Sequence, residues 1–166
     1  MRVRTYVLIA SVAVLFMSSG SKSAKPTVGL NPGDKAPGIE SLGNENSFSF
    51  QNHSGRYTLL NFWAAYDAES RARNVRLMNE IYKSGSENVK VLSFSMDEKE
   101  SIFQETVKSD QLDLSTQFHT ESGEQSELYK KFRLNKGFTN YLIDDQGVII
   151  ASNVTPEKLT EILKTI

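Results

Sequence analysis

Asp67 and Ser70 lie three residues apart, directly after an apolar run, where their side chains could share a chemical task. An aspartate can act as a general acid or base, and residues three apart share one face of a helix. The simpler interpretation of Asp67 is an N-cap, in which aspartate stabilises a helix by about 0.5–2 kcal/mol relative to alanine. Ser70 has no identifiable base and no G-x-S-x-G elbow, so the sequence predicts no serine nucleophile.

Three arginines, Arg71, Arg73 and Arg76, follow this pair within two helical turns. One interpretation is a solvated helix face with i,i+4 ion pairs such as Arg76 with Glu80. The other is a patch that binds a carboxylate or another anion beside the Asp67 position. The solvated face is favoured, because exposed arginine-rich helices are common.

The chain contains no cysteine and only two histidines, His53 and His119. Disulfides, thiolate metal sites, iron–sulfur clusters and cysteine nucleophiles are therefore excluded. Neither histidine has a second histidine or a carboxylate at ligand spacing, and Asp97 with Glu98 and Glu100 is typical of a solvated helix start. We therefore expect no metal and no cofactor.

The elements that position these residues can be read from hydrophobic periodicity. Residues 57–63 form an apolar, aromatic and β-branched run that predicts a central strand, and helix signals extend from Asp67 to Gly85. This order of elements predicts an α/β fold with a central mixed β-sheet and helices on both faces. Further expected elements are a strand at 89–94, helices at 99–108 and 126–132, a hairpin of 141–143 with 148–150, and a helix that Thr155 caps.

Three segments carry a family resemblance: residues 33–37 (Gly-Asp-Lys-Ala-Pro), residues 55–64 (Gly-Arg-Tyr-Thr-Leu-Leu-Asn-Phe-Trp-Ala), and residues 141–144 (Tyr-Leu-Ile-Asp) with Gly147. They resemble the exported thioredoxin-like thiol–disulfide oxidoreductases of the TlpA/ResA type, within the AhpC/TSA-like superfamily. The resemblance extends from about Gly33 to the C-terminus. It implies a thioredoxin-like fold with a small N-terminal β-hairpin extension.

In that family the run matching residues 60–64 leads directly into Trp-Cys-x-x-Cys. Here Tyr66 takes the place of the tryptophan, Asp67 that of the attacking cysteine and Ser70 that of the resolving cysteine. A carboxylate and a hydroxyl cannot carry out dithiol exchange, so the resemblance implies a redox-inactive member. The negative charge of Asp67 at a helix N-terminus could instead mimic the thiolate of the family.

Two further departures lie near this motif. Phe138, just before Thr139, stands where the family has a cis-proline, so we expect a trans bond between Gly137 and Phe138 and a reshaped loop. Val75 replaces a proline that commonly follows the motif, which should leave the helix less kinked.

The resemblance implies a groove between residues 66–70 and the Phe138 loop that accepts extended polypeptide by backbone pairing. We therefore expect a protein- or peptide-binding module without thiol–disulfide exchange. One alternative is an enzyme of another class, with Asp67 as acid or base and Arg71 or Arg73 holding an anionic substrate. Another is a protein grouped with the oxidoreductases of redox homeostasis by homology alone. Candidate groove residues are Trp63, Tyr66, Asp67, Ser70, Arg71, Arg73, Gly137, Phe138 and Thr139, although burial is the favoured interpretation of Trp63.

Length, charge and the N-terminal segment complete these expectations. The 166 residues are 39% hydrophobic with a net charge of -1, which favours one globular domain and no nucleic-acid partner. Residues 1–24 combine Arg2 and Arg4 with an apolar run and a small polar end, the layout of an export signal. We expect a periplasmic or cell-envelope protein, with membrane attachment only if that signal remains as an uncleaved anchor. The predicted organisation is a signal peptide at 1–24, an extended linker at 25–32 and a thioredoxin-like domain at 33–166.

Overall fold

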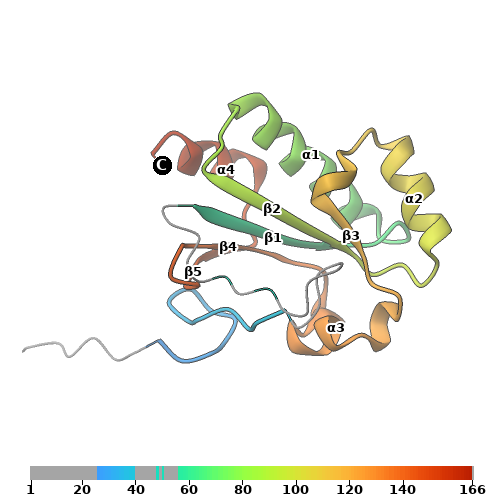
Figure 1. The fold of residues 1–166 in the computed structure, drawn as a ribbon, viewed down its shortest axis with the longest axis horizontal. Coiled ribbons are helices and arrows are strands. Elements are labelled where there is room, and N and C mark those ends of the chain that lie inside the picture. Colours follow the sequence, from blue (N-terminus) through green and yellow to red (C-terminus); the bar gives the residue numbers. More distant parts are fainter. Residues whose placement is uncertain (1–25, 40–47, 49, 51–55, 166) are drawn as a thin grey trace, which may run out of the picture.

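The computed structural model describes residues 26–39, 48, 50 and 56–165 (Figure 1). The predicted export signal and His53 lie outside these residues.

A five-stranded sheet has the order β3-β2-β1-β4-β5. Strands β1, β2 and β3 are parallel, whereas β4 is antiparallel to both β1 and β5, so the predicted mixed sheet is confirmed. The described elements are β1 (Tyr57–Trp63), α1 (Ala68–Ser84), β2 (Val89–Ser95), α2 (Glu100–Ser109), η1 (Leu114–Thr116), β3 (Gln117–His119), η2 (Gly123–Gln125), α3 (Glu127–Lys131), η3 (Leu134–Lys136), β4 (Asn140–Ile143), β5 (Ile149–Ser152) and α4 (Pro156–Leu163).

Strand β1 occupies the middle of the sheet, as its unbroken apolar run predicts. Its alternate side chains enter two separate cores, with Leu59 on the face covered by α1 and α4 and Leu60 on the face covered by α3. Burial of each such leucine contributes about 1.5–3 kcal/mol. A strand that is apolar on both faces is therefore stabilised only where helices cover both faces.

The helices lie on both faces of the sheet, which confirms the predicted layering (Figure 1). On one face α1 and α4 lie side by side and bury Leu77 and Leu159, and α2 packs Phe103 against Trp63. On the other face α3 and the N-terminal segment cover a second core that includes Phe132. No helix among the described residues is both long and apolar enough to cross a membrane.

Helix α1 begins and ends where the sequence signals predict. Asp67 is its N-cap, and Gly85 ends it in the left-handed region at φ 59°, a conformation that glycine adopts without a Cβ penalty. Leu77 is fully buried against the sheet, whereas Tyr82, near the end of the helix, is 88% exposed. The sequence signals therefore predicted the bounds of this helix correctly.

A buried network of polar side chains joins α1 to three strands. Asn61 Nδ2 donates to Asn74 Oδ1 and to Ser93 Oγ, each at 3.0 Å. Asn74 Nδ2 in turn donates to Gln117 Oε1 at 3.0 Å. The four side chains come from β1, α1, β2 and β3, so the network fixes the position of α1 on the sheet.

The N-terminal segment is attached to the β5 edge of the sheet. Gly33 N donates to Ile149 O at 2.8 Å, and Ile149 N donates to Asp34 O at 2.9 Å. Lys35 N donates to Thr27 O at 2.8 Å, so the predicted linker folds back toward the domain.

The predicted N-terminal hairpin falls mostly outside the described residues. Its described part is an antiparallel bridge between Ile39 and Phe48, both of which are buried in the core on the α3 face.

The buried network generates a prediction for stability. Asn74→Ala removes one acceptor of Asn61 Nδ2 and the donor to Gln117 Oε1, so we expect the free energy of unfolding to fall by about 1–3 kcal/mol. Asn79→Ala, an exposed position on the same helix, should change it by less than about 0.5 kcal/mol. Urea unfolding followed by circular dichroism measures both, and equal losses in the two variants would contradict the role given to the network.

Candidate functional site

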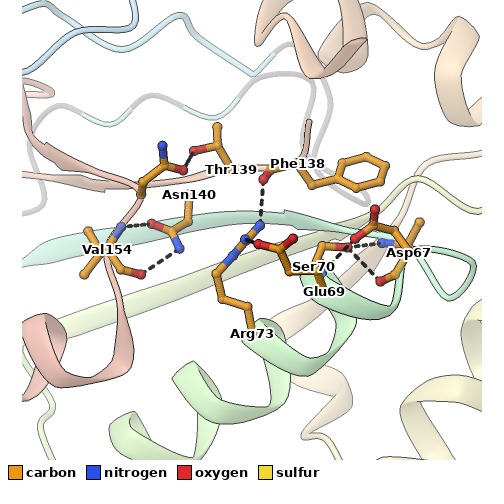
Figure 2. A network of polar contacts seen from close by, with 10 residues as sticks. Asp67, Glu69, Ser70, Arg73, Phe138, Thr139, Asn140 and Val154 are labelled. Atoms are coloured by element: carbon orange, nitrogen blue, oxygen red, sulfur yellow. Dashed lines mark hydrogen bonds and ion pairs between the residues drawn. The ribbon is translucent and has the colours of Figure 1, made fainter. Parts of the chain in front are cut away.

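The start of α1 follows β1 directly and presents Asp67 and Ser70. Asp67 Oδ1 accepts a hydrogen bond from Ser70 N at 2.7 Å, the geometry of a side-chain N-cap (Figure 2). Ser70 Oγ donates to Asp67 O at 3.1 Å and accepts from Ala64 N at 3.3 Å. Both side chains that stand at the predicted redox positions are therefore engaged in holding the helix start.

Asp97 lies beneath this turn, and sequence reasoning missed it. We expected a solvated helix start, but Asp97 is 2% exposed and accepts hydrogen bonds from Ala65 N at 3.0 and 2.9 Å and from Ser95 Oγ at 2.7 Å. The pairing of the parallel strands is the signal that could have identified Asp97. Strands β1 and β2 pair Trp63 with Ser95 at their ends, so the residues that follow the two strands meet at one edge of the sheet.

Three aromatic side chains, Tyr66, Tyr129 and Phe138, form a surface group that we call the aromatic cluster. The ring centroids of Tyr66 and Phe138 lie 6.1 Å apart, and those of Tyr129 and Phe138 lie 6.5 Å apart. Tyr66 is 61% exposed, and its hydroxyl donates to Glu124 Oε1 at 3.0 Å. Partial burial and this hydrogen bond raise the pKa of the Tyr66 phenol, which therefore stays protonated at neutral pH.

Arg73 connects α1 to the loop that carries Phe138. Its Nη2 donates to Phe138 O at 2.7 Å, and its Nη1 lies 3.8 Å from Glu69 Oε1. Figure 2 shows the Phe138 carbonyl directed at the guanidinium while the ring points away from it. The side chain of Arg73 is only 16% exposed, and burial lowers its pKa although Glu69 offsets part of the effect.

The loop at 137–139 depends on a glycine. Gly137 adopts φ 115° and ψ 153°, a conformation that residues with a Cβ rarely reach. The Gly137–Phe138 bond is trans, as the absence of proline predicts. Thr139 O accepts from Phe62 N at 3.1 Å, and Thr139 Oγ1 donates to Asn153 Oδ1. Thr139 thus anchors the loop on the C-terminal side of Phe138.

A cleft of about 580 Å³ lies between the start of α1, the 137–139 loop and the start of α4. Of the predicted groove residues, Asp67, Arg73, Gly137 and Phe138 line it. A smaller hollow of about 320 Å³ is lined by Gly137, Phe138 and Thr139. The structure therefore brings the start of α1 and the Phe138 loop together as predicted.

Three other predicted groove residues are placed elsewhere. Trp63 is fully buried and packs against Phe103, so it belongs to the core. Ser70 is 1% exposed and has no surface for a partner. Arg71 turns away from the cleft and donates to both carboxylate oxygens of Asp110 at 2.7 and 2.6 Å, a bidentate pair between α1 and the end of α2.

The ion pairs of α1 also differ from the expected pattern. Glu80 accepts from Lys83 at 3.1 Å and from Thr160 at 2.8 Å, instead of forming the expected pair with Arg76. The i,i+4 ion pair in this helix is that of Arg73 with Glu69.

The two cysteine positions of the family's motif hold Asp67 and Ser70, and both side chains are hydrogen-bonded within the helix start. Among the described residues, no three His, Cys, Asp or Glu side chains converge in a way that could hold a metal ion. His119 stacks on Phe103, and its Nε2 lies 2.8 Å from Asp97 O. The aromatic cluster, of which Tyr66 is the exposed member, lies beside the cleft and offers a surface that can contact another molecule.

The chain is similar to one protein family and to several solved structures. Residues 32–152 match the model of the AhpC/TSA family. A crystal structure of a thioredoxin-like protein from Parabacteroides distasonis is 67% identical, covers 82% of this chain and 96% of its own, and superposes with a TM-score of 0.74. A thiol–disulfide oxidoreductase from Bacteroides fragilis is 32% identical, with 80% and 98% covered and a TM-score of 0.61. No curated protein matches the chain significantly.

One more solved structure supports the fold alone. The thioredoxin domain of a thiol–disulfide oxidoreductase from Bacteroides vulgatus is 20% identical, with 82% of this chain and 98% of that chain covered and a TM-score of 0.67. The predicted thioredoxin-like fold is thereby confirmed.

The N-cap geometry of Asp67 generates a second prediction. Asp67→Ala removes the acceptor for Ser70 N, so we expect the free energy of unfolding to fall by about 0.5–2 kcal/mol. Asp67→Asn keeps an acceptor without the charge and should retain most of the stability. Urea unfolding of both variants separates the role of Asp67 as a hydrogen-bond acceptor from the role of its negative charge. A loss for Asp67→Asn as large as that for Asp67→Ala would show that the negative charge, and not the cap, is what the helix start requires.

Proposed function

Since this chain belongs to the AhpC/TSA family and contains no cysteine, we propose that it is an exported thioredoxin-fold protein that binds a protein or peptide partner in place of exchanging disulfides. Thiol–disulfide exchange needs one thiolate to attack and a second thiol to resolve the mixed disulfide. The chain supplies a carboxylate at Asp67 and a hydroxyl at Ser70, and neither can form such an intermediate.

The aromatic cluster is the observation that carries the proposal. Tyr66 and Phe138 come from the two segments that border the redox site of this fold, and their rings lie together, with Tyr66 exposed and Phe138 partly buried. Aromatic side chains with little rotamer entropy are enriched at the energetic centres of protein interfaces. The cleft beside them provides a concave surface for the segment that follows a docked side chain.

Export is supported by the N-terminal sequence. Residues 1–24 carry two arginines, an apolar run and a small polar end, and the resemblance is to an exported group of proteins. We therefore place the partner in the periplasm or cell envelope.

The loss of the thiols can be tested by restoring them. We expect the native chain to give no insulin reduction above background, because it has no sulfur nucleophile. The triple variant Asp67→Cys, Ser70→Cys and Phe138→Pro should regain dithiol reduction, since a thiol at the N-cap of α1 would have its pKa lowered by the helix start. Asp67→Cys alone is the matched control without a resolving thiol. Activity in the native chain, or a folded triple variant that stays inert, would contradict the proposed origin of the site.

The binding role can be tested on partner recovery. Native envelope extract is passed over the immobilised protein, and we expect a discrete partner whose recovery falls at least about tenfold with Tyr66→Ala or Phe138→Ala, because each removes an interface anchor. Tyr82→Ala, which removes an equally exposed tyrosine near the opposite end of α1, is the control and should leave recovery unchanged. Recovery that is the same for all three variants would reject the aromatic cluster as the binding surface.

A further inference from the structure

We propose that the partner segment is acidic, with a large apolar side chain that packs on Tyr66 and Phe138 and carboxylates that bind between Arg133 and Lys136. This inference rests on the proposed function and names the chemistry of the partner. It follows from three features of the Phe138 loop: a backbone acceptor that is already hydrogen-bonded, a run of basic residues, and a hollow whose described lining residues include no acid.

The backbone of the loop is already engaged. Arg73 donates to Phe138 O at 2.7 Å, and a hydrogen bond from a charged donor is stronger than one between neutral groups. A peptide that paired with this carbonyl in the manner of an added β-strand would have to share it with the guanidinium. Recognition at Phe138 therefore relies on side chains, whose identity can be selected, more than on the main chain that all peptides share.

The loop stands within a basic segment of a chain that has more acids than bases. Residues 128–143 contain Lys130, Lys131, Arg133 and Lys136 and no aspartate or glutamate. Lys130 forms an ion pair with Glu127 at 3.5 Å. Arg133 and Lys136 are exposed, and no carboxylate of the described residues lies within 4 Å of either charged group.

The 320 Å³ hollow brings these two cations to one place. Arg133 and Lys136 line it together with Phe138 and the polar side chains of Ser152 and Asn153, and its lining contains no acidic residue. Arg133 is also close enough to the Tyr141 hydroxyl to oppose the rise in the pKa of Tyr141 that burial causes. A carboxylate in this hollow would meet two unpaired cations and side-chain donors, next to the ring of Phe138.

The larger cleft is a weaker candidate for the carboxylates. It contains the acids Asp67, Glu69 and Glu157 as well as Arg73, Arg76 and Lys136. Asp67 caps α1 and Glu69 pairs with Arg73. Hydrogen bonds with its own backbone N–H and with Thr155 lower the pKa of Glu157, with a smaller contribution from Arg76. The charges of this cleft largely balance one another, so it suits the uncharged part of a bound segment.

The test uses the purified full chain and synthetic heptapeptides, blocked at both ends, with a central phenylalanine between two pairs of glutamates. Titrations followed by ¹H–¹⁵N NMR at low salt should shift the amides of residues 133–139. Replacement of the glutamates by glutamine should weaken binding roughly tenfold, and replacement by lysine should abolish it, because exposed charge pairs contribute about 0.2–1 kcal/mol each. A central alanine should weaken binding as well. Equal affinities for the glutamate, glutamine and lysine peptides would overturn the proposal.

Charge reversal on the protein gives the reciprocal test. The double variant Arg133→Glu with Lys136→Glu should raise the dissociation constant of the glutamate peptide roughly tenfold, and Lys108→Glu, on α2, should leave it unchanged. Circular dichroism and urea unfolding confirm that both variants are folded. If Tyr66→Ala still abolishes partner recovery but the double variant alters neither recovery nor titration, the proposed function stands and the acidic partner is rejected. Binding to phosphatidylglycerol vesicles that the double variant abolishes, without any response to the peptide, would assign the hollow to a lipid phosphate and also overturn the proposal.

Discussion

The hydrogen bond from Arg73 to the Phe138 carbonyl determines what the surface at the former redox site can do. It spans 65 residues of sequence and ties the first turns of α1 to the loop that would carry the cis-proline. The bond holds Phe138 beside Tyr66 and engages the Phe138 carbonyl, which a bound polypeptide would have to share with the guanidinium. The aromatic cluster and the cleft depend on this hydrogen bond between Arg73 and Phe138. The same bond favours recognition through side chains over recognition through the main chain.

The residues at the former redox positions are now structural. Asp67 caps α1, Ser70 joins the cap to the preceding turn, and buried Asp97 holds the same turn from below. A buried carboxylate is costly unless its oxygens are hydrogen-bonded, and Asp97 accepts from both a backbone N–H and a serine hydroxyl. The helix start is thus held by hydrogen bonds of Asp67, Ser70 and Asp97, none of which carries a thiol.

Patterns among residues that are close in sequence predict most of the fold. The apolar run of β1, the Asp67 cap and the Gly85 stop depend on neighbours in sequence and were predicted correctly. The bonds of Arg71 to Asp110, of Arg73 to Phe138 and of Asp97 to Ala65 join residues 39, 65 and 32 positions apart. Such contacts depend on strand order and helix packing, which periodicity does not specify. For the same reason the sequence places Trp63 next to the motif and favours its burial, but does not identify Phe103 as the residue against which it packs.

The central claim is that a molecule binds at the Tyr66–Phe138 surface in the living cell, and site-specific photocrosslinking tests it most directly. A photoreactive benzoylphenylalanine replaces Tyr66 in one strain and Tyr82, which is 88% exposed at the other end of α1, in a second strain. We expect a discrete adduct from position 66 that position 82 does not give, and we expect the acidic peptide to reduce its formation in extracts. The absence of an adduct at position 66, or the same adducts at both positions, would contradict the central claim.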